Sequence, residues 1–475
     1  MTRIACSLVV SLASLAACSS DPGAGAAEGS AEASTGPGGD GSGSASDSAS
    51  GSASASVSAS GSSSDGGSSG NDASSGNTDA GTDGSADSGA SSESGGSTTG
   101  IGGEPNVLYV RDDGQDGNPG TIEEPMRTIQ WAIAQAESAG TIDTIRIAEG
   151  SYGFDYANDA HIVVVDGISL YGGYRADWGD RDPARYPTLV VDQSATAIAS
   201  SEDDPHRAIE VPASVGADTV LDGLHVEVAM GQFRAALLVA GDVTVRNSVI
   251  APVVDASSVS TYGVRVLEGA PTVVANRFVF DVVGNDGLSF AVSGEYTDGT
   301  FADNIIDLSG LTGYGYGFYF IGGAQAVLAN SVWIAAGANM TGVWLNYATP
   351  TIENNVIESE DDGAVCIWSS GGASVPAALH NNVLDCYYTL FGSDPLRSWT
   401  TIMEVEGGLV DASDNLKLPQ AFTSATVDMA LDETAPCTVT LGGRDLGAGF
   451  SQDIDGLTRT DPRSIGAHEW DGDCQ

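Results

Sequence analysis

Residues 328–356 read LANSVWIAAGANMTGVWLNYATPTIENNV, and this stretch decides the fold because it holds one complete repeat. A five-residue frame opens and closes it: an apolar residue, any residue, asparagine, any residue and a second apolar residue. Between the two frames lies a short apolar run opened by glycine, Gly342-Val343-Trp344-Leu345. No helical pattern separates these pieces, so the stretch is typical of short strands joined by turns.

The same frame occurs six times, with 24 to 29 residues from one central asparagine to the next. The asparagines are Asn247, Asn276, Asn304, Asn330, Asn354 and Asn381. This period is too short for a β–α–β unit and suits one coil of a β-solenoid, whose coils pair about 4.8 Å apart. Asparagine suits a coil corner because it tolerates the left-handed αL conformation and its amide can bond the equivalent residue in the next coil. The repeats therefore predict an all-β domain, a parallel β-helix.

A second strand recurs in each coil, opened by Gly263, Gly287, Gly317, Gly342 and Gly363. Alternation along a strand places the first and third residues after glycine inward and the middle one outward. The predicted outward row is Arg265, Ser289, Tyr319, Trp344 and Val365. We expect Arg265, Tyr319 and Trp344 to form a strip that stacks sugar rings, with a cation at one end. The alternative is a satellite core, in which loops fold over these rings.

The N-terminal part of the repeat region predicts a cap. An amphipathic helix places Ile129, Ala132, Ile133 and Ala136 on one face, ahead of a strand at 143–147. A solenoid needs such an element to cover the open edge of its first coil.

Three stretches resemble bacterial right-handed parallel β-helix proteins of the pectate-lyase-like group, many of which are grouped under a domain of unknown function. They are Asn118-Pro-Gly-Thr121 with the helix that follows, Ile168-Ser-Leu-Tyr-Gly-Gly-Tyr174, and Asp453-Ile-Asp-Gly456 with Ile465-Gly-Ala467. Ser464 stands where those relatives usually carry aspartate. The resemblance spans about residues 107–470 and implies the right-handed fold. It implies little about function, because this architecture hosts lyases, hydrolases, epimerases and adhesins.

The first residues are typical of an export signal. Arg3 is followed by a short apolar run that is too short to span a bilayer. The run ends in Leu15-Ala-Ala-Cys18, which is similar to a bacterial lipobox, so we expect a signal peptide at 1–17 and lipidation of Cys18. Ser19, rather than aspartate, then implies sorting to the outer membrane or cell surface. An ordinary signal peptide cut near Ala17 is the alternative.

Residues 18–104 are almost wholly Ser, Gly, Ala, Asp and Thr, and they predict a disordered linker that spans roughly 50 Å. The β-helix domain is expected at 105–475. The whole chain has 64 acidic and 17 basic residues and a formal charge of −47. This charge repels nucleic acids and anionic lipid headgroups, so membrane contact is expected through the lipid anchor alone.

Four cysteines follow the linker, and an even number in an exported chain predicts two disulfides. We favour Cys366 with Cys386, one coil apart, and Cys437 with Cys474 at the C-terminus.

Candidate catalytic groups are few. Polysaccharide lyases of this architecture use a strong base, but the sole lysine, Lys417, falls in a predicted C-terminal turn, which leaves Arg265 as the best placed base. Neighbouring carboxylates at 202–204 and 360–362 resemble solvated turns more than a hydrolase site. Asp112, Asp113 and Asp116 are candidates to hold calcium, although ordinary Asx turns are the favoured explanation of these residues, and calcium is the one cofactor left open.

We therefore expect a surface lipoprotein that binds a polysaccharide or another cell-envelope glycan, with no assignable catalytic residue. The alternative is a carbohydrate-active enzyme, a polysaccharide lyase or glycoside hydrolase with an atypical site. Two carboxylates converging in a groove would favour the enzyme. A third reading is a rigid spacer without a ligand.

Overall fold

The computed structural model describes residues 104–155, 161–195, 199–284, 287–334, 339–359, 363–370, 374–393, 397–418, 437–440, 442–446, 451–459 and 463–468. The expected signal peptide, Cys18 and all but the last residue of the expected linker lie outside these ranges. Within the described ranges, no helix is both long and apolar enough to cross a membrane.

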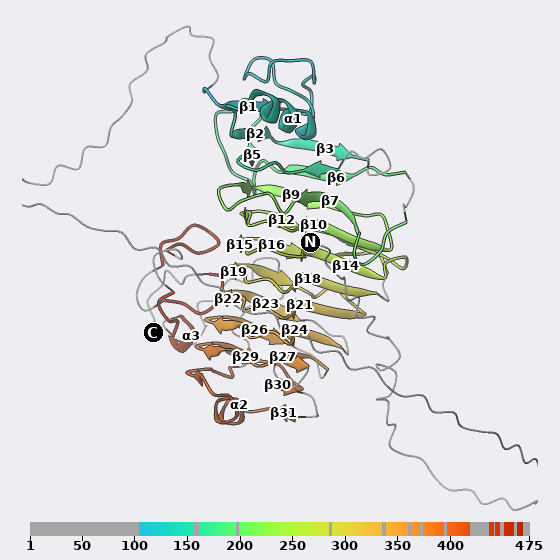
Figure 1. Ribbon diagram of the computed structural model, residues 1–475. Helices are drawn as coiled ribbons and strands as arrows, with labels where there is room; N and C mark the ends of the chain where they lie inside the picture. The colour runs from blue at the N-terminus through green and yellow to red at the C-terminus, as the bar shows by residue number, and fades with distance from the viewer. Residues whose placement is uncertain are drawn as a thin grey trace, which may run out of the picture. The chain divides into compact units, whose positions relative to one another are not determined.

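The described residues form a right-handed parallel β-helix of nine coils, and each coil gives one strand to each of three sheets (Figure 1). Sheet A runs in the order β1 (Val107–Val110), β2 (Thr144–Ala148), β5 (Ser169–Tyr174), β8 (Val220–Asp222), β11 (Thr244–Arg246), β15 (Thr272–Val274), β19 (Thr300–Ala302), β22 (Ala326–Leu328), β25 (Thr351–Glu353), β28 (Ala378–His380) and β32 (Ala412–Ser413). Sheet B runs in the order β3 (Gly150–Phe154), β6 (Thr188–Asp192), β9 (Leu224–Glu227), β12 (Val249–Ile250), β16 (Arg277–Val279), β20 (Ile305–Asp307), β23 (Ser331–Ile334), β26 (Val356–Ser359) and β29 (Val383–Asp385).

Sheet C runs in the order β4 (Ile162–Val163), β7 (His206–Val211), β10 (Phe233–Val239), β14 (Ser260–Val266), β18 (Leu288–Glu295), β21 (Tyr314–Ile321), β24 (Met340–Asn346), β27 (Val365–Ser370), β30 (Thr389–Ser393) and β31 (Arg397–Trp399). A further small pair joins β13 (Val253–Val254) and β17 (Asp281–Val282). Neighbouring strands are parallel except β30 and β31, which are antiparallel. The predicted fold is confirmed.

The core lies inside the coils and is built from columns of apolar side chains in register. In sheet A the middle residue of each three-residue strand points inward, as Val245, Val273, Phe301 and Val327 do. These four side chains are almost completely buried. Burial of such columns, coil after coil, is the main stabilising term of the domain.

The corner between sheets A and B takes two residues, and each has its own role. The first adopts a positive φ in successive coils, at Gly223, Asn247, Ala275, Asp303, Ala329, Asn354, Asn381 and Asp414. The second is buried, at Ser248, Asn276, Asn304, Asn330, Asn355, Asn382 and Asn415. The prediction that one asparagine per coil both adopts the αL conformation and bonds to the next coil was therefore wrong. The sequence frame mixed the two positions because asparagine fits either one.

The buried asparagines form a continuous hydrogen-bonded ladder along the helix. Asn330 Oδ1, for example, accepts from the backbone N–H of Asn304 at 3.0 Å and from Asn304 Nδ2 at 2.9 Å. Asn330 Nδ2 donates in turn to Asn355 Oδ1 and to the Phe301 carbonyl, each at 2.9 Å. The same pattern continues to Asn415, whose N–H donates to Glu406 in helix α2 (Ile402–Gly408).

Helices α1 (Ile129–Ala139) and α2 (Ile402–Gly408) lie near opposite ends of the β-helix (Figure 1). The side chain of Thr128 accepts from Trp131 N–H at the start of α1. The buried residues of α1 are Ile129, Ala132, Ile133 and Ala136, as predicted. Helix α2 begins at Thr401 with a capping box. These helices cover the apolar ends of the coils, which would otherwise face water.

The last described segments fold back along sheet B. Ile465 and Ala467 pack with Val439, from α3 (Cys437–Thr440), against outward residues of sheet B that include Trp333 and Val356. Arg459 forms a buried ion pair with Asp303 at 2.6 Å. Burial raises the pKa of Asp303 to about 7, although Arg459 acts to lower it. The closing motif expected from the family resemblance is therefore part of the packed domain.

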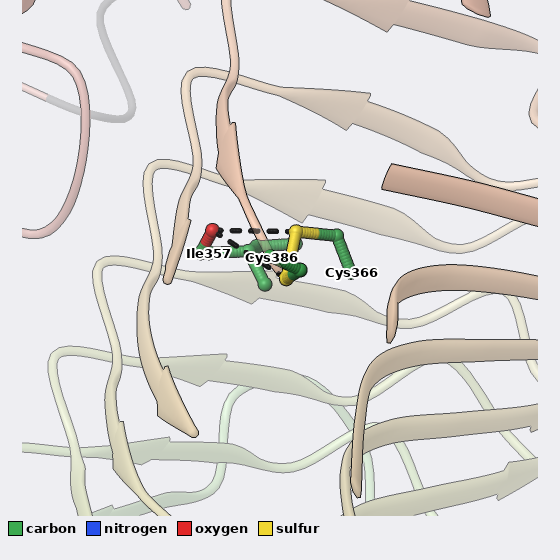
Figure 2. The surroundings of a disulfide bond; sticks show 3 residues. All are labelled: Ile357, Cys366 and Cys386. Atoms are coloured by element: carbon green, nitrogen blue, oxygen red, sulfur yellow. Dashed lines mark hydrogen bonds between the residues drawn. A yellow bond between two sulfur atoms is a disulfide. The ribbon is translucent and has the colours of Figure 1, made fainter. Parts of the chain in front are cut away.

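Cys366 and Cys386 form a disulfide inside the core, as predicted (Figure 2). Cys366 lies on β27 and Cys386 follows β29, so the bond joins two successive coils. Cys437 is also disulfide-bonded. Its predicted partner Cys474 lies outside the described residues, so that pairing remains a prediction.

A buried carboxylate between sheets B and C should make the fold sensitive to acid. Asp192 Oδ2 lies 2.8 Å from His206 Nε2, and Asp192 Oδ1 accepts from Ser194 N–H. Burial raises the pKa of Asp192, but the bonds from His206 and Ser194 outweigh it and bring the pKa to about 2. This value lies below the usual aspartate pKa of about 3.9, so the folded state binds this proton less readily than the unfolded chain does.

The stabilisation from Asp192 is therefore complete above about pH 4 and is lost as the pH falls through about 2. We expect the melting temperature to fall over this window in the natural chain and to fall less in the Asp192→Asn variant. Thermal unfolding between pH 2 and 5 measures both slopes. Equal slopes of melting temperature against pH in the two proteins would show that Asp192 is not the source of the acid sensitivity.

Candidate functional site

The outer face of sheet C carries two rows of side chains, one on each side of a bend in its strands. By the bend we mean the point where in–out alternation breaks, because a small residue and the residue after it both point inward. The small residues are Ala236, Gly263, Ala291, Gly317, Gly342 and Cys366. A Cβ atom on Gly342 would lie 2.5 Å from Ile357 and 2.7 Å from the Cys366 carbonyl oxygen, which explains the small residue. The rows on either side differ in exposure.

The row before the bend is a stack of buried rings, Tyr262, Phe290 and Tyr316, which we call the stacked row. Ring centroids lie 4.9 Å apart in both steps, and the planes are 10° and 11° from parallel. Burial raises the pKa of Tyr262 to about 12 and also raises that of Tyr316, so both phenols stay neutral. These rings form a satellite core against which Tyr319 and Trp344 pack as partly buried side chains, so the satellite core remains the alternative for the predicted strip.

The row after the bend holds Arg265, Ser293, Tyr319, Trp344 and Trp368 in one register. The predicted neighbours Arg265, Tyr319 and Trp344 are thus in line, with Arg265 two coils from Tyr319. Ser289 and Val365 do not belong to this row, because both lie before the bend. The prediction failed there because Gly287 and Gly363 are not the residues at the bend, where Ala291 and Cys366 stand.

Tyr319, Trp344 and Trp368 form what we call the aromatic strip, with one ring on each of three successive coils. Neighbouring centroids lie 6.3 and 5.7 Å apart, and the planes differ by 25° and 34°. All three side chains are half-buried, and Tyr319 and Trp344 stand nearly edge-on to Tyr316, at 70° and 87°. The strip is therefore a run of similarly oriented rings parallel to the helix axis, and part of it is open to solvent.

Arg265 lies at one end of this row but does not face solvent. Its side chain is 3% exposed and donates to Glu295 at 2.9 Å, with Glu202 at 4.0 Å on its other terminal nitrogen. The guanidinium also lies 4.6 Å from the centroid of Tyr262. Arg265 therefore links the stacked row to two carboxylates. Its guanidinium is not open to a ligand, so the predicted direct contact with a sugar does not fit its position.

Glu202 and Glu295 also affect the phenol of Tyr319 electrostatically. Burial raises the pKa of its phenol, Glu202 and Glu295 raise it further, and Arg265 opposes them. The phenol of Tyr319 stays protonated at neutral pH, so it can donate a hydrogen bond from the strip.

Two further tyrosines rise from the corner between sheets C and A. Tyr296 and Tyr347 are 76% and 64% exposed and lie two coils apart, with Gly322 between them. Both have positive φ, of 52° and 57°, which bulky residues seldom adopt. They border the same outer face as the aromatic strip.

Residues 113–386 match a family described as a protein of unknown function, DUF1565. The match covers more than half of the chain. The chain belongs to the DUF1565 family. No curated protein matches it in sequence.

Three solved structures are similar to this DUF1565 chain at low identity. Pectate lyase Pel9A has 12% identity over 76% of this chain and 96% of that chain, with a TM-score of 0.41. The Dettilon tailspike protein (gp208) has 11% identity over 61% of this chain and 68% of that chain, with a TM-score of 0.25. XylC in complex with xylose has 10% identity, coverage of 76% and 98%, and a TM-score of 0.20. Likeness at this level carries no argument about ligand or activity.

The candidate catalytic residues of the DUF1565 chain are not gathered into one site. Lys417 is exposed beyond β32, where Leu416 bridges to Val383 of sheet B, away from the aromatic strip. Glu202 and Glu295 do approach the strip, but the Arg265 guanidinium lies between them and contacts both. The carboxylates at 360–362 lie outside the described residues.

The three calcium candidates have separate roles. Asp113 forms an ion pair with Arg111 at 2.5 Å, and Asp116 Oδ1 accepts from the N–H groups of Arg127 and Thr128. Asp112 lines a cavity of about 370 Å³ beside α1, which Asp116 also lines. Among the described residues, these three carboxylates are not a group close enough to share one metal ion.

The structure brings together one group that the sequence did not suggest. Single ligand atoms of Asp453, Asp455 and His468 lie within 4.8 Å of one another. His468 Nδ1 is 2.8 Å from Asp455, and Asp453 accepts from the N–H groups of Asp455 and Leu457. These bonds hold the C-terminal closing turn. Sequence spacing could not reveal the group because His468 is 13 residues from Asp455.

Proposed function

We propose that this DUF1565 protein binds a glycan through the aromatic strip on sheet C. One observation carries the proposal: three partly exposed rings of similar orientation, Tyr319, Trp344 and Trp368, lie one per coil along the helix axis. Aromatic rings present large rigid areas at low entropic cost, which suits the apolar faces of sugars.

The coil spacing supports this reading. Successive coils lie about 4.8 Å apart, and the centroids of neighbouring strip rings lie 6.3 and 5.7 Å apart. A glycan running along the helix axis would therefore meet one ring on each of three successive coils. The Tyr319 phenol and Asn346, in the next outward row of the same sheet, would supply hydrogen bonds beside the rings.

We further propose that the domain works outside the cell. This part rests on the sequence alone, on the lipobox-like Leu15-Ala-Ala-Cys18 and on the Ser- and Gly-rich residues that follow it. A lipid-anchored domain on a long tether would reach glycans of the cell envelope.

Binding should depend on the strip. We expect the Tyr319→Ala, Trp344→Ala double variant to lose roughly 10- to 100-fold in glycan affinity, because each ring contact contributes about 0.5–1.5 kcal/mol. The measurement is a glycan array of the full chain, followed by titration calorimetry on the best neutral ligand. Tyr387→Ala is the matched control, since Tyr387 is 67% exposed and follows Cys386 in another part of the coil.

Undiminished binding in the double variant would reject the strip as the site. Turnover of a glycan by the natural chain would instead establish the alternative function, a carbohydrate-active enzyme. In that case the carboxylates beside Arg265 would be the first to replace.

A further inference from the structure

The arginines of sheet C whose side chains the structure describes, Arg207, Arg234 and Arg265, all pair with carboxylates. Arg207 and Arg265 each contact two of them, whereas Arg234 contacts one. The pairs are Arg207 with Asp204 and Glu210 at 2.6 Å each, Arg234 with Asp255 at 3.3 Å, and Arg265 with Glu295 at 2.9 Å and Glu202 at 4.0 Å. The charge of each of these three guanidinium groups is thus neutralised or outnumbered by carboxylates.

The pairs are also arranged with their cations inside. The Arg265 side chain is 3% exposed, whereas those of Glu295 and Glu202 are 34% and 66% exposed. Arg207 follows the same order, because its side chain is less exposed than those of both its partners. The charge that meets solvent beside the aromatic strip is therefore negative.

We infer that the aromatic strip accepts glycans without carboxylates and excludes polyuronates, an inference that rests on the proposed function. A uronate chain laid along the strip would bring its carboxylates toward Glu202 and Glu295, where the Arg265 guanidinium is already paired with both. The carboxylates of the ligand and of the protein repel one another. The formal charge of −47 on the whole chain adds to this repulsion at low ionic strength. An uncharged sugar pays no such cost on the same rings.

Two hexasaccharides of equal length test the inference, cellohexaose as the neutral probe and hexagalacturonate as the charged one. We expect hexagalacturonate to bind the full chain at least about tenfold more weakly at low salt in EDTA, and the gap to narrow as sodium chloride is added. EDTA removes divalent cations that could bridge carboxylates.

The variant Glu202→Gln should reduce the ratio of the two affinities, cellohexaose over hexagalacturonate, by about threefold and leave cellohexaose binding unchanged. Glu202 is mostly exposed and 4.0 Å from Arg265, so its replacement leaves the closer Glu295 pair intact. Glu137→Gln on α1 makes the same charge change at the N-terminal end of the β-helix, away from the aromatic strip, and should leave the difference in affinity as it is (Figure 1).

The outcomes separate the two proposals. Hexagalacturonate that binds as tightly as cellohexaose, in a manner abolished by Tyr319→Ala, Trp344→Ala, would overturn the charge selection and keep the binding strip. If Glu137→Gln narrows the gap as much as Glu202→Gln does, net charge alone is responsible and the local inference fails. Binding of neither probe, with no neutral ligand on the array, would overturn the proposed function itself.

Discussion

Replacing Asn330 by alanine is expected to lower the free energy of unfolding by about 3–5 kcal/mol, because four polar groups inside the core each lose a hydrogen bond. The Asn330 side chain accepts from the N–H and Nδ2 of Asn304 and donates to the Phe301 carbonyl and to Asn355 Oδ1. Asn330 is fully buried, so water cannot replace these bonds without opening the coil. Unfolding of the full chain in urea measures the loss.

The turn position of the corner, taken from another coil, supplies the control. Asn247 is exposed, adopts φ 51°, and its side chain donates to Asp222 at 3.2 Å. Asn247→Gly should change stability by less than about 1 kcal/mol, because glycine adopts positive φ freely but has more freedom in the unfolded chain. If the two variants lost equal stability, the division of the corner into a turn position and a ladder position would be wrong.

This division also shows where sequence reasoning reached its limit. The spacing of asparagines was enough to predict the coils, because each coil needs a corner and asparagine is favoured there. It could not assign register, since Asn276 belongs to the ladder and Asn354 to the turn, yet both fit one frame. Only hydrogen bonding between coils separates the two positions.

The candidate site was predicted in part for a related reason. Tyr319 and Trp344 were placed correctly because the bend in their strands happens to carry glycine, at Gly317 and Gly342. Trp368 was missed because Cys366 takes the place of that glycine. Any small or adaptable inward residue fills the bend, so glycine alone is an incomplete guide to the row.

The burial of Arg265 could not be predicted from its own strand. Its partner Glu295 ends the next strand of sheet C, and Glu202 comes from a loop more than two coils earlier. Such contacts depend on the course of the loops between strands, and the loops do not follow the sequence repeat of the coils. They are also the contacts that set the charge beside the aromatic strip.

Removing the disulfide inside the core is expected to cost about 3 kcal/mol. The bond between Cys366 and Cys386 closes a loop with a sequence separation of 20, and loop closure in the unfolded chain predicts this magnitude. Both cysteines are fully buried, so the Cys366→Ala, Cys386→Ala variant avoids placing new hydroxyl groups in the core. Urea unfolding of the full chain, compared with the natural protein, gives the difference.

Reduction of the natural chain tests whether the covalent bond or the packing of sulfur is responsible. Cys437 is disulfide-bonded as well, so each measurement needs a Cys437→Ala background in which only the core bond remains. In that background, reductant should destabilise the natural core pair by about 3 kcal/mol and leave the double alanine variant unchanged. A reductant effect of equal size in both would assign the stability to another bond, whereas no effect in either would show that packing between coils holds this region without the disulfide.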